Sequence, residues 1–218
     1  MGGCSNKSLK GHYMERHNEA TRMIASYLTH SEDPNIRNSA IILDAGRTNH
    51  LNLQSHNRVP EEYLPEEFQG EQNIFRPDIL LTIPQPDNDL GFQPYPTDSI
   101  EYKRATSRLI ILEVGFGSDY RLETTTAFKE KQHRDLVTAL TKAHWKGTDN
   151  FNNILTIPLI FGHSGLTPIA TRQNLMKHLK LPYQKAEKLC GNIGHMAIDK
   201  LAHITTQRHK LVAQIGSS

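Results

Sequence analysis

Four short runs of aliphatic residues divide the chain, and they constrain its fold more than any other feature of the sequence. They occupy residues 40–44, 79–83, 109–114 and 154–161. Each run has the length of a strand and is bounded by turn-forming residues, which is typical of strands buried in a protein core. Pro158 predicts that the last run is an edge strand or contains a bulge, because proline gives no N–H to a strand ladder.

Helical patterns lie around these runs. Apolar residues recur at helical spacing in residues 13–30, 124–144, 169–179 and 184–212. An interruption is expected in the last of these at Gly191 and Asn192. Helices that alternate with strands predict an α/β fold, in which a central mixed sheet is flanked by helices. Residues 54–73 are expected to form a surface loop, and the proline-rich residues 84–107 a loop insertion.

The length and composition favour one intracellular domain. A chain of 218 residues can bury a single hydrophobic core. It contains no apolar run of about 20 residues and no apolar segment behind Met1, so neither a membrane span nor a secretory signal is expected. Two cysteines cannot build a disulfide framework. The formal net charge of +2 is too small to indicate a nucleic-acid-binding protein by itself.

Two acidic residues stand at the ends of neighbouring predicted strands. Asp78 follows a proline at the start of one strand, and Glu113 lies 35 positions later, near the end of the next. If the strands pair, the carboxylates are adjacent, and adjacent carboxylates are stable mainly when they share a cation. Such oxygen ligands suit Mg²⁺ or Mn²⁺. Alternatively, Asp78 caps a turn and Glu113 is a solvated residue at a strand end.

Five short motifs follow one another within about residues 11–140. They are Arg16-His17-Asn18-x-Ala20, Arg76-Pro77-Asp78, Leu112-Glu113-Val114-Gly115-Phe116, Ser118-Asp119-x-Arg121 and Lys129-x-x-Gln132-His133. Their order and combination resemble the PD-(D/E)xK nuclease superfamily, and more narrowly the restriction-like endonuclease domain of certain non-LTR retrotransposon polyproteins. This resemblance implies a restriction-endonuclease-like core. It also implies an enzyme that nicks DNA, so that the element's reverse transcriptase can extend the exposed 3′ hydroxyl.

The resemblance assigns the metal site to the two carboxylates. Asp78 and Glu113 match the metal-binding acidic residues, with the backbone carbonyl of Val114 as a further ligand. The lysine that the superfamily usually carries two residues after the acidic residue is absent, because that position is Gly115. This departure puts catalytic activity in question.

In some branches of the superfamily the lysine lies on the following helix, where Lys129 matches it. Lys131 is the alternative, and Lys129 is then an ordinary solvated lysine. His133, four residues after Lys129, falls on the same helical face and is a candidate supporting residue. Its alternative role is that of a polar residue on the helix surface.

Four other residues have candidate supporting roles. Arg121 suits a contact to the carboxylates or to a DNA phosphate. Glu19 matches an additional acidic residue of the first helix, although it could instead pair with Arg22 within that helix. Arg16 and Arg76 are expected to contact DNA.

Cys4 and His12 stand where relatives complete a Cys/His zinc knuckle whose other ligands lie upstream. Because a structural zinc site normally needs four ligands, two cannot form one, and no zinc is expected. The reading frame is therefore expected to belong to a longer polyprotein, with reverse transcriptase and zinc-knuckle regions upstream. Its partner would be DNA, and its place of action the nucleus.

The predicted organisation has three parts. Residues 1–11 are expected to be a flexible remnant of a zinc-knuckle-like segment, residues 12–165 the nuclease core and residues 166–218 a helical C-terminal extension. The predicted function is that of a metal-dependent DNA endonuclease domain with Mg²⁺ or Mn²⁺ as cofactor. Two alternatives stay open: a catalytically inactive retrotransposon-derived remnant that binds DNA weakly, and an unrelated α/β interaction module.

Overall fold

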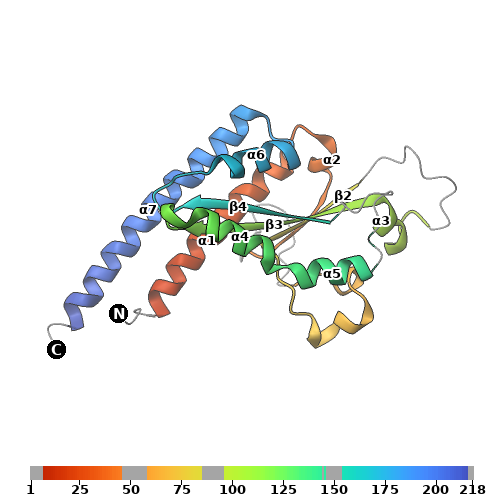
Figure 1. Cartoon of the computed structure of the whole chain (residues 1–218), viewed down its shortest axis with the longest axis horizontal. Coiled ribbons are helices and arrows are strands. Elements are labelled where there is room, and N and C mark those ends of the chain that lie inside the picture. The colour runs from red at the N-terminus through yellow and green to blue at the C-terminus, as the bar shows by residue number, and fades with distance from the viewer. Residues whose placement is uncertain (1–6, 46–57, 85–95, 144, 146–153, 216–218) are drawn as a thin grey trace.

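Helices and strands alternate along the chain, as Figure 1 shows. The computed structural model describes residues 7–45, 58–84, 96–143, 145 and 154–215. The helices are α1 (Lys7–Thr29), α2 (Pro34–Arg37), α3 (Ile100–Thr106), α4 (Leu122–Gln132), α5 (Arg134–Lys142), α6 (Ile169–His178) and α7 (Tyr183–Ile215). The strands are β1 (Ala40–Leu43), β2 (Ile79–Pro84), β3 (Ser107–Gly117) and β4 (Ile154–Gly162). The prediction of an α/β fold with a mixed sheet flanked by helices is confirmed.

The four strands form one sheet in the order β1, β2, β3, β4. The first three are antiparallel, and β4 is parallel to β3. A parallel pair needs a crossover connection, which here contains α4 and α5. Among the described strands β4 pairs with β3 alone, so it is an edge strand, as Pro158 predicts.

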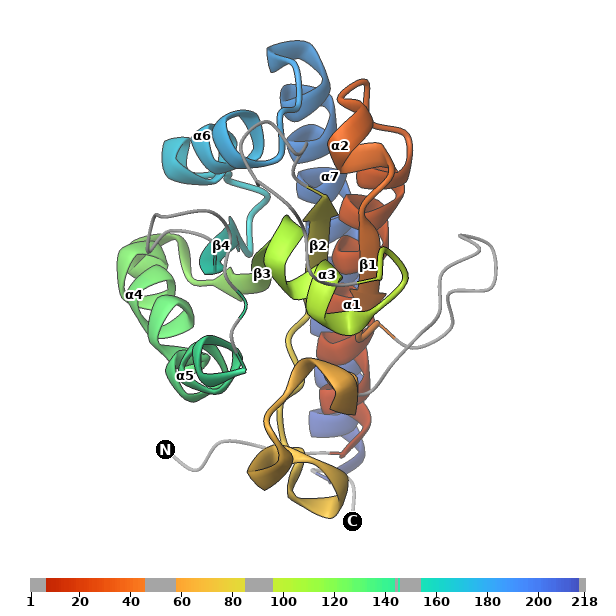
Figure 2. The ribbon, with the colours of Figure 1, turned by 90° about the vertical axis from the view of Figure 1, so that its right-hand side faces the viewer.

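Strand β3 is buried on both faces, which explains why it reads as an unbroken apolar run. Leu109 and Ile111 pack in a core that includes residues of α5. Ile110, Leu112 and Val114 pack on the opposite face, in a core shared with α1, α6 and α7. The sheet therefore lies between α4 and α5 on one side and α1 and α7 on the other (Figure 2).

The two longest helices, α1 and α7, run antiparallel along one face of the sheet (Figure 1). Lys200 Nζ of α7 lies 2.9 Å from Glu19 Oε2 of α1. Further along, the rings of His12 and His203 meet edge to face, with centroids 4.8 Å apart. The helices of residues 166–218 thus pack directly on the sheet and on α1. No helix in the described part is both long and apolar enough to cross a membrane.

The single helix predicted for residues 124–144 is in fact two. The backbone leaves helical angles at His133, with φ −113° and ψ 29°, and α5 begins at the next residue. The break turns the apolar side of α5, with Leu136 and Leu140, onto the sheet. The same break leaves His133 between the two helices, with its side chain buried.

The interruption predicted at Gly191 and Asn192 is wrong, because α7 continues through both residues. A glycine inside a helix costs about 1 kcal/mol relative to alanine, and tertiary packing of residues such as Ile193 outweighs that cost here. The nearby Gly194 has a steric role. A Cβ at this position would lie 2.7 Å from the carbonyl oxygen of Gly165, so glycine permits close contact with the turn after β4.

The prediction that residues 54–73 form a surface loop is wrong from residue 58 onward. The chain there forms three 3₁₀ turns, at Glu61–Tyr63, Glu66–Phe68 and Gly70–Gln72. Val59 and Tyr63 are buried in the same core as α5. Trp145 Nε1 donates a 3.0 Å hydrogen bond to the carbonyl of Tyr63. The segment from residue 58 to residue 73 thus packs partly in the core, although its sequence has no periodic pattern of apolar residues.

The insertion predicted for residues 84–107 is more ordered at its ends than expected. Pro84 ends β2, α3 occupies Ile100–Thr106, and Ser107 begins β3, while residues 85–95 lie outside the described residues. At the N-terminus, residues 7–11 belong to α1 rather than to a flexible segment. Cys4 and the rest of residues 1–6 lie outside the described residues.

Candidate active site

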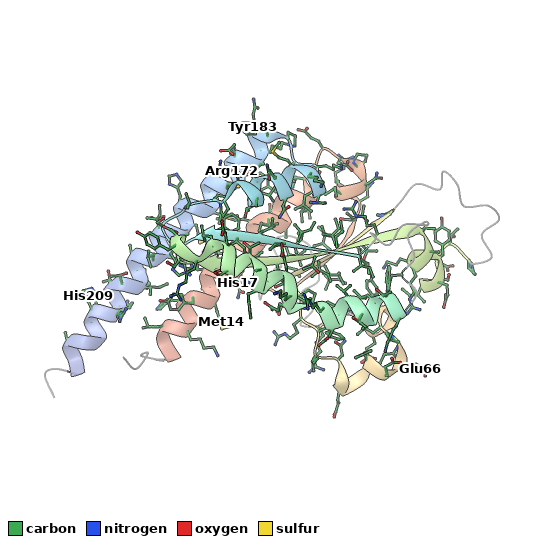
Figure 3. The ribbon with its side chains drawn as sticks, viewed as in Figure 1. Met14, His17, Glu66, Arg172, Tyr183 and His209 are labelled. Atoms are coloured by element: carbon green, nitrogen blue, oxygen red, sulfur yellow. The ribbon has the colours of Figure 1, made fainter. Side chains whose placement is uncertain are left out.

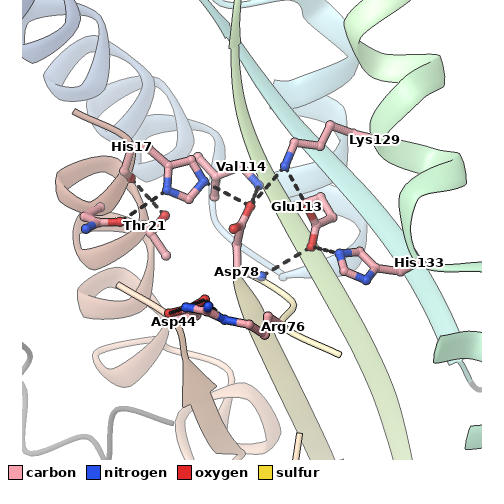
Figure 4. Close-up of polar contacts among 10 residues, drawn as sticks. His17, Thr21, Asp44, Arg76, Asp78, Glu113, Val114, Lys129 and His133 are labelled. Carbon is pink, nitrogen blue, oxygen red and sulfur yellow. Dashed lines mark hydrogen bonds and ion pairs between the residues drawn. The ribbon is translucent and has the colours of Figure 1, made fainter. Parts of the chain in front are cut away.

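Asp78 lies immediately before β2, where donors from three elements meet one of its carboxylate oxygens. Oδ2 accepts a 2.8 Å hydrogen bond from the backbone N–H of Val114 in β3. The same atom lies 3.1 Å from Nε2 of His17 in α1 and 3.5 Å from Nζ of Lys129 in α4 (Figure 4). The sheet, α1 and α4 therefore converge on a single acidic side chain.

Glu113 lies beside Asp78, one position beyond the pairing of Ile79 with Leu112. Its side chain is fully buried, and Oε2 is 2.9 Å from Nζ of Lys129. Oε1 accepts a 3.3 Å hydrogen bond from the backbone N–H of Asp78. Nε2 of His133 lies 2.7 Å from Oε1, the distance of an ion pair with a protonated ring, although its angle is not that of a hydrogen bond.

Lys129 is the residue that joins the two carboxylates. Its ammonium contacts both Asp78 and Glu113, and its side chain is only 16% exposed. Lys131, the alternative lysine, is exposed on α4, and none of the described contacts joins it to either carboxylate. Of the two candidates, the structure brings Lys129 to the site.

The charges in this cluster support one another. Burial alone would raise the pKa of Asp78, but the hydrogen bond and charge of His17, with the charge of Lys129, outweigh burial and lower it. Burial also opposes the charges on His17 and Lys129, yet contacts with the neighbouring carboxylates raise the pKa of both. Lys129 is therefore an ammonium ion at neutral pH.

The carboxylate oxygens of Asp78 and Glu113 are the type of ligand that a hard divalent cation prefers. Mg²⁺ is commonly held by one or two carboxylates, and waters and substrate phosphates complete its coordination. Asp78 and Glu113 supply two carboxylates from neighbouring strands. Val114, whose carbonyl is the predicted third ligand, contacts Asp78 through its N–H. Among the residues described, three or more His, Cys, Asp or Glu side chains are nowhere grouped as a metal site.

Glu19 is not brought to the carboxylates. It is bound to Lys200 of α7, as described above. The alternative pairing with Arg22 is not formed either, because Arg22 contacts Glu15 at 2.8 Å and the carbonyl of Ala45 at 2.8 Å. Glu19 thus links α1 to α7.

The three arginines lie in different surroundings. Arg16 is only 3% exposed, and its guanidinium lies 4.4 Å from the ring centroid of Phe116. This burial does not fit the predicted contact with DNA, because a phosphate cannot reach the guanidinium without rearrangement. Arg76 is exposed and pairs with Asp44 at 3.1 Å. Arg121 is exposed just before α4 and, within the described part, forms no ion pair with the carboxylates.

His17 is the site residue that the sequence analysis did not assign. It belongs to the same motif as Arg16, so the motif marked the correct segment of α1. Figure 4 shows His17 on α1 beside Asp78, whereas His209 lies toward the C-terminal end of α7 in Figure 3. The contact with Asp78 depends on how α1 is rolled on the sheet, and the sequence pattern does not fix that roll.

Comparison with known proteins adds no assignment. None of the protein-family models searched matches the chain, and the curated proteins searched contain no match. The site's geometry and the sequence motifs therefore carry the functional argument.

Proposed function

We propose that this chain is a metal-dependent DNA endonuclease domain with a restriction-endonuclease-like core, as its motifs imply. The observation that carries the proposal is the convergence of three side chains. Lys129 Nζ lies 3.5 Å from Asp78 Oδ2 and 2.9 Å from Glu113 Oε2. These residues are 16 to 51 positions apart in sequence and come from the position just before β2, from β3 and from α4.

The arrangement accounts for the missing lysine of the superfamily motif. A Cβ added to Gly115 would lie 3.6 Å from Cε of Lys129. The aliphatic chain of Lys129 thus runs over the glycine, and its ammonium reaches the carboxylates from the helix. This supports a lysine that is displaced in sequence but present in space, and it argues against loss of the catalytic lysine.

Each residue of the cluster then has a chemical role. Mg²⁺ or Mn²⁺, when bound by Asp78 and Glu113, would lower the pKa of a water molecule and offset charge on the phosphodiester. Lys129 is kept protonated by the carboxylates, so it would act as a hydrogen-bond donor and positive charge beside the scissile phosphate rather than as a base. His133 would help to hold Glu113.

DNA would approach over exposed basic residues. Arg121 stands just before α4, the helix that carries Lys129, and suits a contact with a backbone phosphate. Arg76 lies two residues before Asp78 and is free to exchange its exposed pairing with Asp44 for a phosphate. The resemblance further implies that reverse transcriptase and zinc-knuckle regions of a longer polyprotein supply target recognition, and that the nick is made in the nucleus.

Nicking of supercoiled plasmid DNA tests this function. We expect the protein to produce nicked circles with Mg²⁺ or Mn²⁺ and none with a chelator. Asp78→Ala and Glu113→Ala should each abolish nicking, while Glu130→Ala, which removes an exposed carboxylate of α4, should not. Nicking that survives both site substitutions would refute the site. Absence of nicking with every metal would favour the inactive remnant.

A further inference from the structure

The two carboxylates are not held in the same way. Asp78 receives three donors, and all of them contact the same oxygen, Oδ2. From the part of the chain that the structure describes, Oδ1 receives no such contact. One oxygen of Asp78 is therefore anchored and the other is available to a ligand.

A bound cation would compete with some of the donors to Asp78 Oδ2 and not with others. Lys129 also contacts Glu113, so a cation shared by the two carboxylates would compete with its ammonium for the same oxygens. Of the two carboxylates, His17 contacts that of Asp78, from α1 on the opposite face of the sheet from α4. Its hold on Oδ2 can persist whether or not Lys129 moves.

His17 itself is well placed to act as an anchor. The hydroxyl of Thr21 donates a 2.9 Å hydrogen bond to the backbone carbonyl of His17, one turn earlier in α1. The next turns bury Ala20 and Ile24 completely or almost completely in the core beneath the sheet. The helix is thus fixed on the sheet, and the imidazole is 27% exposed at its margin.

We propose that His17 is a positioning residue, which fixes Oδ2 of Asp78 and so directs Oδ1 toward the divalent cation. The inference rests on the proposed metal site and deepens it. Without His17, and with Lys129 in competition with the cation, the N–H of Val114 would be the remaining donor to Oδ2. The carboxylate could then rotate more freely about its Cβ–Cγ bond, and the cation would bind less tightly because its ligand would be less well oriented.

Calorimetric titration of the chelator-treated full chain with Mn²⁺ tests the proposal. We expect His17→Ala to raise the Kd for Mn²⁺ about tenfold or more, in line with other residues that orient metal ligands. His17→Gln should recover most of the affinity, because its amide nitrogen reaches about as far as Nε2. His17→Asn is too short and should resemble His17→Ala. A purely structural role for His17 would not produce this dependence on reach.

His30→Ala is the matched control, since His30 is an exposed histidine near the end of the same helix. Its Kd should equal that of the wild type, and thermal melts should show that all variants are folded. If Asp78→Asn abolishes Mn²⁺ binding while His17→Ala leaves it unchanged, the inference fails and the metal site stands. Equal Kd values for His17→Gln and His17→Ala would also overturn it. If the wild type binds no Mn²⁺ through Asp78, both proposals fail.

Discussion

The side chain of Lys129 lies against Gly115. A Cβ at that glycine would come within 3.6 Å of Cε and 3.7 Å of Cγ of the lysine. Gly115 and Glu113 face the same side of β3, so the absence of a side chain at 115 leaves the path along which Lys129 reaches Glu113. A side chain larger than a methyl group at position 115 would crowd the path that Lys129 takes to Glu113.

Lys129→Met should lower the rate of plasmid nicking by roughly a hundredfold or more, because it removes a donor aimed at developing charge. Lys131→Met should leave the rate near that of the wild type, since Lys131 is exposed on the same helix. Initial rates at saturating Mg²⁺ measure both. A larger loss of rate in Lys131→Met than in Lys129→Met would show that Lys131, and not Lys129, has the catalytic role.

Gly115→Val should destabilise the protein by about 1–3 kcal/mol and slow nicking. The new Cβ would lie 2.8 Å from Cδ1 of Ile160, and the two methyl groups beyond it would crowd the side chain of Lys129. Gly191→Ala is the control, since that position of α7 is open and alanine should stabilise the helix by up to about 1 kcal/mol. Urea unfolding measures both changes. Wild-type stability and rate in Gly115→Val would contradict the packing described.

Glu113→Ala should lower the free energy of unfolding of the metal-free protein by about 3 kcal/mol. The substitution leaves Lys129 without its closest partner in a buried site, and breaking a buried pair in this way is strongly destabilising. The exposed Glu130→Ala should change stability by no more than about 0.5 kcal/mol. Urea unfolding in the presence of a chelator makes the comparison, and similar values for the two variants would show that the cluster is not coupled.

The metal-free protein should be most stable, with respect to the His17–Asp78 pair, between about pH 4 and 6.5. The pKa of Asp78 is lowered, so its contribution is present above its unfolded pKa and is lost as pH falls through the folded one. The pKa of His17 is raised, so its contribution is complete below 6.5 and is lost as pH rises through the folded pKa.

The measurement is urea unfolding of the wild type and His17→Ala from about pH 4 to 9, with a chelator present. Asn18, Asp78 and Lys129 are the polar and charged groups that act on the imidazole, and all three are retained in both proteins. The stability difference should be largest below pH 6.5 and should shrink above it. A difference that stays constant from pH 5 to 9 would show that the pair is not linked to protonation.

The carboxylates were predictable because they depend on short-range features. Asp78 and Glu113 sit at the ends of two apolar runs, and once β2 and β3 pair, the register brings them together. The candidate lysine came from the resemblance, since Lys129 lies 16 residues after Glu113 on a separate helix, and no spacing in the sequence connects the two. Strand β3 was predictable because it is buried on both faces and therefore reads as an unbroken apolar run.

His17 and Tyr63 were harder to predict, each for a physical reason. On a helix, His17 and Glu19 point about 160° apart, so choosing between them requires knowing how α1 is rolled on the sheet. That roll is set by tertiary packing of its apolar side. Tyr63 lies in an aperiodic segment, and its burial depends on contact with Trp145, which is 82 residues away. Periodicity along the chain cannot report such a contact.

If Asp78 and Glu113 share a divalent cation, anomalous diffraction from crystals soaked in Mn²⁺ will locate it. We predict an anomalous peak about 2.0–2.2 Å from a carboxylate oxygen of each residue, with the Lys129 ammonium displaced from between them. Soaked crystals without such a peak, in which Lys129 still bridges both carboxylates, would show that Asp78 and Glu113 do not share a divalent cation.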